Sequence, residues 1–133
     1  MRREPVLIHG TGQNVRDWIH VSDHVRGIER AVLNGNTGEV YNIGGGTASE
    51  RTNLKIAEMI CDIIDDERNQ TTGRSRKLIT LTGNRPGNDL RYSMNADKLQ
   101  RQTGWKPLIS LKDGLRETVR WYTNNPIYRE RIN

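Results

Sequence analysis

The sequence lacks the features that mark exported and membrane proteins. Its 133 residues include a single cysteine, Cys61, so no internal disulfide is possible. No stretch approaches the ~20 consecutive apolar residues that a membrane-spanning helix needs. The first ten residues, MRREPVLIHG, carry charge but no apolar segment of the kind found in a signal peptide. We therefore expect a cytoplasmic protein.

Apolar and aromatic residues are also scarce. Hydrophobic residues make up 33% of the chain, aromatic residues 5%, and phenylalanine is absent. This is a thin supply for a core, yet the apolar residues cluster and recur at regular spacing, which a disordered chain would not need. The length suits one domain. We predict a single folded domain over residues 1–133.

Acidic residues are too few to balance the second half of the chain. Residues 1–50 contain five Lys/Arg and six Asp/Glu, whereas residues 51–133 contain sixteen and ten. A basic half favours an anionic partner, such as nucleic acid, an acidic surface or a phosphorylated small molecule. A solvated, mildly basic surface would give the same totals, so charge alone does not choose between these readings.

The hydrophobic pattern predicts alternating strands and helices, which is an α/β arrangement. Strands are expected over residues 16–21, 39–43 and 77–83. Helices are expected over residues 23–33, from residue 52 or 53, over residues 96–103 and from Ser110, with a loop over residues 65–77. Ser22, Asn95 and Ser110 are the expected N-caps. A parallel sheet needs several strands with helices on both faces, and the chain supplies few strands to pair with the strand–helix–strand unit within residues 16–43.

No catalytic or metal-binding constellation is evident from the residues alone. The three histidines, His9, His20 and His24, have no cysteine or acidic partner at a metal-ligand spacing. There is no nucleophile elbow, and Cys61 falls on the apolar face of a predicted helix. We expect it to be a small buried hydrophobe.

The glycine cluster NIGGGTASER, residues 42–51, lies between a predicted strand and a predicted helix, as a dinucleotide fingerprint does. Ser49 stands where the third glycine should be, and no acidic residue closes a later strand. An NAD site is therefore not predicted here. The helix N-terminus could still face an anion through Asn53 and free backbone N–H groups. A simple helix cap would explain Asn53 equally well.

The stretch GNRPGNDLRY, residues 83–92, has two possible interpretations. Pro86 holds Arg85 in an extended conformation and Gly87 permits a sharp change of direction. A guanidinium projecting from the end of a strand can fork onto a phosphate. The alternative is a solvated, hairpin-like turn with surface arginines.

Five motifs occur in a fixed order along the chain. They are GxGxxxRDW with V-DH (10–24), GE-YNIGG (38–45), an asparagine that opens the next helix, RPGxDxRY (85–92) and GW-P (104–107). Together they resemble the C-terminal part of the dTDP-glucose 4,6-dehydratases, in the nucleotide-sugar branch of the extended short-chain dehydrogenase/reductases. The resemblance runs from about Pro5 to Tyr128. It implies an α/β fold: a small substrate-binding domain plus a strand–helix–strand piece of a truncated Rossmann domain, in which residues 16–45 normally pack against the NAD-binding domain.

The resemblance also implies substrate contacts. Arg16 and Arg85 match the arginines that grip the nucleotide pyrophosphate, and Asn53 matches an asparagine that contacts the nucleotide. Asn88 stands where the family has a histidine, and His9 where it has an aromatic residue. These departures leave the ligand open between dTDP-glucose and a UDP-sugar. They also admit a related epimerase or decarboxylase.

The family binds NAD through an N-terminal glycine-rich unit and catalyses with a Tyr-x-x-x-Lys pair. None of the four tyrosines here has a lysine four positions later. The resemblance therefore implies an NAD-dependent lyase as the parent enzyme, of which this chain is a part without cofactor site, catalytic residues or activity of its own.

Two alternatives of other classes remain. One is a free-standing basic binding module, supported by the charge of the second half but not by its sparse aromatics. The other is a self-associating homo-oligomeric element. It would use Val25, Ile28, Val40 and Ile43, which should be exposed without the NAD-binding domain.

Overall fold

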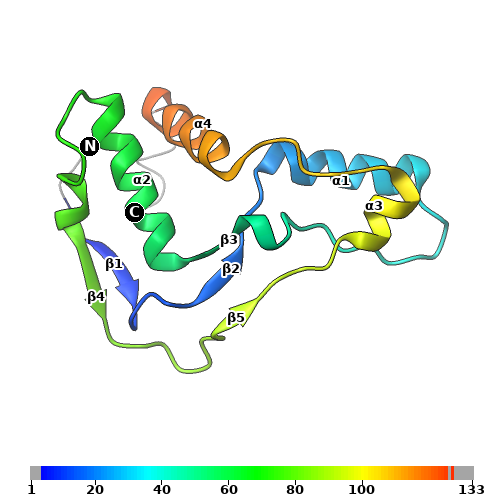
Figure 1. Cartoon of the computed structure of the whole chain (residues 1–133), viewed down its shortest axis with the longest axis horizontal. Coiled ribbons are helices and arrows are strands. Elements are labelled where there is room, and N and C mark those ends of the chain that lie inside the picture. Colours follow the sequence, from blue (N-terminus) through cyan, green and yellow to red (C-terminus); the bar gives the residue numbers. More distant parts are fainter. Residues whose placement is uncertain (1–3, 126, 128–133) are drawn as a thin grey trace.

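The structure is a computed structural model that describes residues 4–125 and 127. Its strands are β1 (Val6–His9), β2 (Val15–Asp17), β3 (Glu50–Thr52), β4 (Ile79–Thr82) and β5 (Arg91–Tyr92). Its helices are α1 (Val21–Asn34), α2 (Asn53–Glu67), α3 (Asp97–Thr103) and α4 (Leu111–Asn124), with 3₁₀ turns at Thr47–Ser49 and Ser75–Leu78. Figure 1 shows an elongated molecule with α2 and α4 toward one end and α1 and α3 at the other.

The strands form two small sheets. β1 pairs in parallel with β4, while β2 lies between an antiparallel β3 and a parallel β5. The prediction of an α/β fold is confirmed by these strands and helices. Residues 83–90 connect β4 in the first sheet to β5 in the second, so GNRPGNDLRY is not a hairpin turn.

Helix α2 is longer than predicted and is fixed at its C-terminal end by an internal carboxylate. Asp65, expected in a loop, is fully buried within the helix and accepts hydrogen bonds from the Ser75 backbone N–H at 3.0 Å and the Ser75 hydroxyl at 2.6 Å. Burial raises the pKa of Asp65, but the hydrogen bonds from Ser75 and from the backbone of Gly73 and Arg74 outweigh it and lower the pKa below its usual value. The chain therefore returns to the helix before entering β4.

The core at the other end is built by α1, α3 and the segment after α3. Leu99, Ala96 and Trp105 are buried there. The Trp105 indole N–H donates to the Asp23 carbonyl oxygen at 3.1 Å. The fully buried Asp23 carboxylate accepts from the backbone N–H groups of Leu108 and Ile109. The DH and GW-P motifs thus meet to join α1 to the segment that leads into α4.

The predicted strand over residues 39–43 is wrong. This segment forms no strand, and Val40 is 80% exposed. An extended segment becomes a strand only when a neighbouring backbone supplies its hydrogen bonds, and no described strand lies beside this one. The strand–helix–strand piece expected within residues 16–45 is therefore incomplete.

Helix ends were predicted with mixed success. Helix α1 starts at Val21 rather than 23, and its N-cap is His20, whose Nδ1 accepts from the Ser22 backbone N–H at 3.4 Å. The strand expected over residues 16–21 is correspondingly shortened. Ser110 does cap α4, accepting from the Asp113 N–H at 3.1 Å. Gly104 ends α3 in the left-handed region, at a φ of 68°.

Asn95 is not the N-cap of α3. That position is Ala96, although the Asn95 side chain accepts from the Asp97 N–H at 2.8 Å. Because proline cannot continue a helix, the sequence predicts Pro126 as the limit of the last helix, and this residue lies outside the described residues. Within residues 4–125 and 127, no helix is long and apolar enough to cross a membrane.

Candidate functional site

All five side chains that the sequence analysis proposed as ligand contacts line one cavity of about 530 Å³. His9 comes from the end of β1, Arg16 from β2 and Asn53 from the start of α2. Arg85 and Asn88 come from the loop between β4 and β5. Segments distant in sequence therefore converge on one concave surface.

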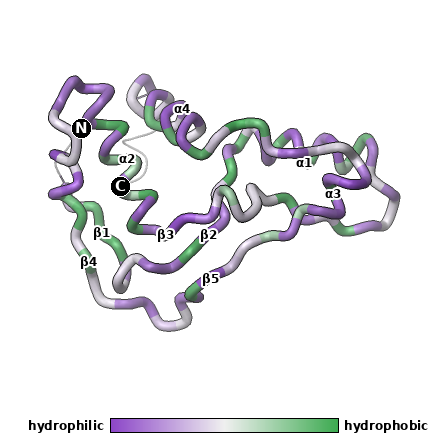
Figure 2. The backbone as a smooth tube through the Cα atoms, in the orientation of Figure 1, coloured by the Kyte–Doolittle hydropathy of each residue, from purple (hydrophilic) through white to green (hydrophobic). Residues whose placement is uncertain are grey.

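The cavity has a polar end and an apolar wall. The wall consists of β1 residues opposite one face of α2, including Leu7, Ile56 and Ile60. Figure 2 shows apolar colour on β1 and along parts of α2. The arginines and asparagines gather toward the N-terminus of α2. An anionic group would be favoured at the polar end and a flat apolar group beside the wall.

Arg16 is held by the loop that carries the RPG motif. Its Nη2 donates to the Asp89 carbonyl oxygen at 3.0 Å and to Asn88 Oδ1 at 3.3 Å, while Nη1 donates to the Val15 carbonyl oxygen at 2.7 Å. Asn88 therefore contacts Arg16 directly. A neutral amide there accepts from the guanidinium, whereas a cationic histidine would repel it.

Arg85 differs from Arg16 in its surroundings. It is exposed and lines the cavity. Within the described part of the chain it has no hydrogen-bond or ion-pair partner. Its five donors are therefore available to a ligand.

The interpretation of Asn53 as a helix cap is wrong. The N-cap of α2 is Thr52, whose hydroxyl oxygen accepts from the Lys55 N–H at 3.1 Å. The Asn53 side chain lines the cavity and makes no hydrogen bond within residues 4–125 and 127. It is thus free to bind a ligand.

The expected free backbone N–H groups at the N-terminus of α2 are also not found. The N–H of Asn53 donates to the Asn14 carbonyl oxygen and that of Leu54 to the Gly12 carbonyl oxygen, both at 3.0 Å. The Lys55 N–H is taken by Thr52. The backbone N–H groups of residues 53–55 are therefore not available to an anion, whereas the Asn53 side chain is.

Asn14 is a site-building residue that the sequence did not reveal. It is buried, and its side-chain Nδ2 donates to the Asp89 carbonyl oxygen at 2.9 Å. Since its own carbonyl oxygen accepts from Asn53, it fixes the RPG loop beside the start of α2. In the sequence, an asparagine after Thr-Gly-Gln is typical of an ordinary turn, so no local signal marked it.

His9 lies at the edge of the cavity. Its Nδ1 is 3.3 Å from the Thr82 hydroxyl oxygen and 3.4 Å from the Gly83 carbonyl oxygen. These contacts fix the ring to the end of β4. The ring can present its other nitrogen or its edge to a ligand, but it cannot offer the area of a tyrosine.

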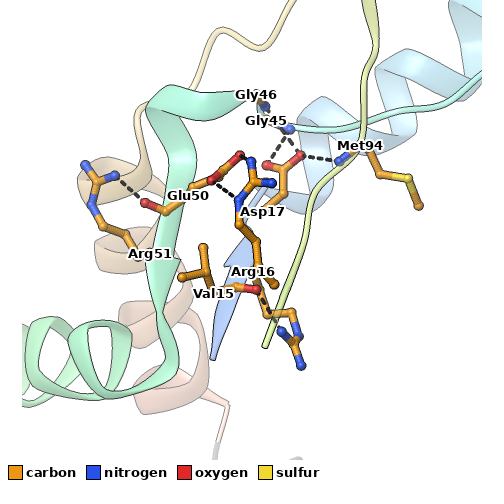
Figure 3. A network of polar contacts seen from close by, with 9 residues as sticks. Val15, Arg16, Asp17, Gly45, Gly46, Glu50, Arg51 and Met94 are labelled. Carbon is orange, nitrogen blue, oxygen red and sulfur yellow. Dashed lines mark hydrogen bonds and ion pairs between the residues drawn. The ribbon is translucent and has the colours of Figure 1, made fainter. Parts of the chain in front are cut away.

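The glycine cluster donates backbone hydrogen bonds to a carboxylate of the protein itself. Figure 3 shows the Asp17 carboxylate facing the backbone N–H groups of Gly45, Gly46 and Met94, with N–O distances of 2.9, 3.4 and 3.5 Å. A Cβ on Gly44 would stand 2.4 Å from Asp17 Oδ2. These glycines admit Asp17, so the loop does not fit the pyrophosphate of NAD.

Arg91, the second arginine of GNRPGNDLRY, serves the scaffold. It donates from Nε and Nη2 to the two carboxylate oxygens of Glu50 at 3.0 and 2.7 Å, tying β5 to β3 across β2. Hydrogen bonds from Arg91, and then from Ser93, lower the pKa of Glu50. The hydrogen bond with Glu50 in turn raises the pKa of Arg91. Arg91 is therefore not available as a second ligand clamp.

Cys61 forms part of the cavity floor. It is buried, as expected, and burial raises the pKa of its thiol, with smaller contributions from Asp65 and Asp62. A protonated thiol in this position is a packing group and not a nucleophile. No group of three His, Cys, Asp or Glu in residues 4–125 and 127 could hold a metal ion.

Comparisons with known proteins converge on nucleotide-sugar enzymes. The sequence profile of the GDP-mannose 4,6 dehydratase family matches residues 1–118. A dTDP-glucose 4,6-dehydratase from Salmonella typhimurium is 43% identical over 122 residues, which are 92% of this chain and 33% of that protein. The chain thus spans about a third of the length of the curated relatives it matches.

Solved structures similar to this chain are also those of nucleotide-sugar enzymes. A dTDP-glucose 4,6-dehydratase from Streptomyces venezuelae, with NAD and TYD bound, has a TM-score of 0.78 and 37% identity, covering 94% of this chain and 36% of its own. A UDP-glucose 4-epimerase from Thermotoga maritima, with UDP-glucose, has a TM-score of 0.77 and 28% identity, covering 93% of this chain and 36% of its own.

Proposed function

The chain belongs to the GDP-mannose 4,6 dehydratase family, and we propose that it forms the nucleotide-sugar-binding portion of a dTDP-glucose 4,6-dehydratase. The observation that carries the proposal is the cavity in which Arg16, Arg85 and Asn53 meet beside an apolar wall. Two guanidinium groups suit a pyrophosphate because their N–H groups can donate charge-assisted hydrogen bonds to phosphate oxygens. The apolar wall favours a nucleoside over a bare anion.

The relatives support a choice of nucleotide. Several curated relatives at 37 to 43% identity are dTDP-glucose 4,6-dehydratases, whereas the UDP-glucose 4-epimerase is 28% identical. We therefore propose a dTDP-sugar as the ligand. A UDP-sugar epimerase or decarboxylase is the alternative for the parent enzyme, and Asn88 and His9 are the positions at which the choice would be made.

Calorimetric titration of the purified chain with dTDP, UDP and thymidine tests the proposal. We expect dTDP to bind more tightly than UDP, and thymidine to bind weakly because it lacks the pyrophosphate. Arg85→Ala should weaken dTDP binding by about tenfold or more, since a charge-assisted hydrogen bond contributes roughly 1.5–3 kcal/mol.

Arg101→Ala is the matched control. Arg101 is exposed on α3, outside the cavity, and its loss removes the same charge. If Arg85→Ala and Arg101→Ala lose dTDP affinity equally, the loss is explained by net charge alone. Absence of dTDP binding, together with steeply salt-dependent binding of DNA, would favour the basic binding module instead.

We also propose that the chain has no dehydratase activity alone, because no Tyr-x-x-x-Lys pair is present in its sequence. Incubation with dTDP-glucose and NAD should leave the sugar nucleotide intact. Catalytic consumption of dTDP-glucose by the purified chain would contradict this.

Self-association is a second role, favoured by an apolar stripe on α1. Val21, Val25, Ile28 and Val32 recur at helical spacing, and all four are exposed. Exposed stripes of this kind usually bind a partner. Ile43, expected in the same surface, is instead half-buried against the core of Leu99 and Trp105.

Light scattering over a concentration series tests this role. We expect a mass that rises toward a dimer, and a monomer for Val25→Lys combined with Val32→Lys. Leu81→Lys, which changes an exposed apolar residue on β4, is the control and should still associate. A wild-type monomer at high concentration would refute the role.

A further inference from the structure

We infer that Tyr92 is a positioning residue that holds the Arg16 guanidinium in place for the pyrophosphate of the ligand. The inference rests on the proposed function and extends it. The guanidinium carbon of Arg16 lies 4.2 Å from the centroid of the Tyr92 ring. A planar cation over an aromatic face is attracted by the ring's quadrupole.

The pairing of strands explains this contact. Arg16 in β2 and Tyr92 in β5 are direct neighbours in a parallel pair. Side chains of directly paired residues leave the sheet on the same face, so their positions are set by the backbone. Tyr92 is half exposed at 54%, and within residues 4–125 and 127 its hydroxyl has no hydrogen-bond partner. The ring's described polar contact is therefore the one to Arg16.

The remaining contacts of Arg16 show what the stacking achieves. Three of its donors go to Val15, Asn88 and Asp89, all in the plane of the guanidinium. Tyr92 restricts the group from its face. Two N–H donors remain without an acceptor in the described part of the chain. A preformed donor costs a ligand less side-chain entropy than one that must first be ordered.

Arg85 supplies the contrast. No described residue holds its guanidinium. The two arginines thus differ in kind: Arg16 is ordered before the ligand arrives, and Arg85 is ordered by the ligand. In this arrangement, removing Tyr92 should affect binding only through Arg16.

The test is a double-mutant cycle with dTDP as the probe, measured by calorimetry on the full chain. Tyr92→Leu should weaken binding about two- to fivefold, as expected for an exposed cation–π contact. Tyr92→Phe keeps the ring and should bind as the wild type does. In an Arg16→Ala background, Tyr92→Leu should cause no further loss.

Tyr92 also lines the cavity, so it could instead contact the nucleotide directly. In that case Tyr92→Leu would weaken dTDP binding equally with and without Arg16, and the inference would be overturned. Wild-type affinity in Tyr92→Leu would overturn it as well. Tyr122→Leu, a change on α4 outside the cavity, should leave binding unaltered.

A second measurement does not depend on ligand binding. Ring current from Tyr92 should shift the nuclear magnetic resonance of the Arg16 Nε–H proton. The shift should persist in Tyr92→Phe and disappear in Tyr92→Leu. If the shift is present but dTDP does not bind, the proposed function fails and the positioning contact stands. If dTDP binds but the shift is absent from the wild type, the positioning role fails alone.

Discussion

Two adjacent residues at the start of α2 should separate ligand binding from fold stability. Thr52 caps the helix through its hydroxyl, and Asn53 directs its side chain into the cavity without an internal partner. Thr52→Ala leaves the Lys55 N–H without its acceptor. We expect this to cost about 1 kcal/mol of unfolding free energy, the usual effect of losing an N-cap.

Asn53→Ala should have the opposite profile. The Asn53 backbone N–H still donates to Asn14, and alanine is a good helix former. The unfolding free energy should therefore stay within about 0.5 kcal/mol of wild type. Loss of a neutral hydrogen bond to the ligand should weaken dTDP binding roughly two- to tenfold.

Urea denaturation and calorimetry on the same three proteins provide the comparison. Thr52→Ala should shift the urea midpoint and lower the melting temperature by roughly 3–5 °C, with dTDP affinity unchanged once the protein is folded. If Asn53→Ala lowers stability as much as Thr52→Ala while binding stays intact, Asn53 is structural and its assignment to the site is wrong.

Three further predictions concern the scaffold. Asp23→Ala should lower the unfolding free energy by about 3–5 kcal/mol because two backbone N–H groups and Arg26 lose a fully buried acceptor, and Asp23→Asn should cost less in the same urea titration. The pKa of Asp65 is lowered in the folded state, so the stability difference between wild type and Asp65→Asn should be full above the ordinary carboxyl pKa of about 3.9 and shrink as pH falls below it. A difference constant from pH 7 to pH 2 would contradict this. Gly45→Ala should destabilise by about 1–3 kcal/mol because its Cβ would meet the Trp18 carbonyl oxygen at 2.6 Å, whereas Gly83→Ala, with open space around it, should be near neutral in thermal melts.

The sequence predicted the helices better than the sheets. The start of the helix at residues 53–67 and the cap at Ser110 follow from local rules, since helix bonds are formed within the segment. Strands depend on partners distant in sequence. Residues 39–43 have a strand pattern but no neighbouring strand. Residues 83–90, for which a hairpin-like turn was one of two interpretations, cross between two sheets.

Arg85 and Asn53 were candidates from local patterns, the Arg-Pro-Gly turn and the start of a helix. Arg16, Asn88 and His9 were candidates only through the resemblance to a known family. Asn14 could be identified in neither way. Its role depends on two partners, Asp89 and Asn53, that come together only in the folded chain. The prediction of free N–H groups at the α2 N-terminus was wrong for the same reason, because the loop containing Gly12 and Asn14 supplies their acceptors.

The RDW motif shows why ligand contacts and scaffold contacts occur side by side. Successive residues of a strand point to opposite faces, so Arg16 faces the cavity while Asp17 faces the glycine loop. Trp18 then donates its indole N–H to the Arg51 carbonyl oxygen at 3.2 Å, joining this segment to β3. Gly44 and Gly45 leave room for Asp17 to approach the backbone of the loop, and Gly46 has a positive φ of 77°. A sequence motif that resembles a phosphate loop thus serves to orient the strand that carries Arg16, and the phosphate of the proposed ligand would lie on the opposite face.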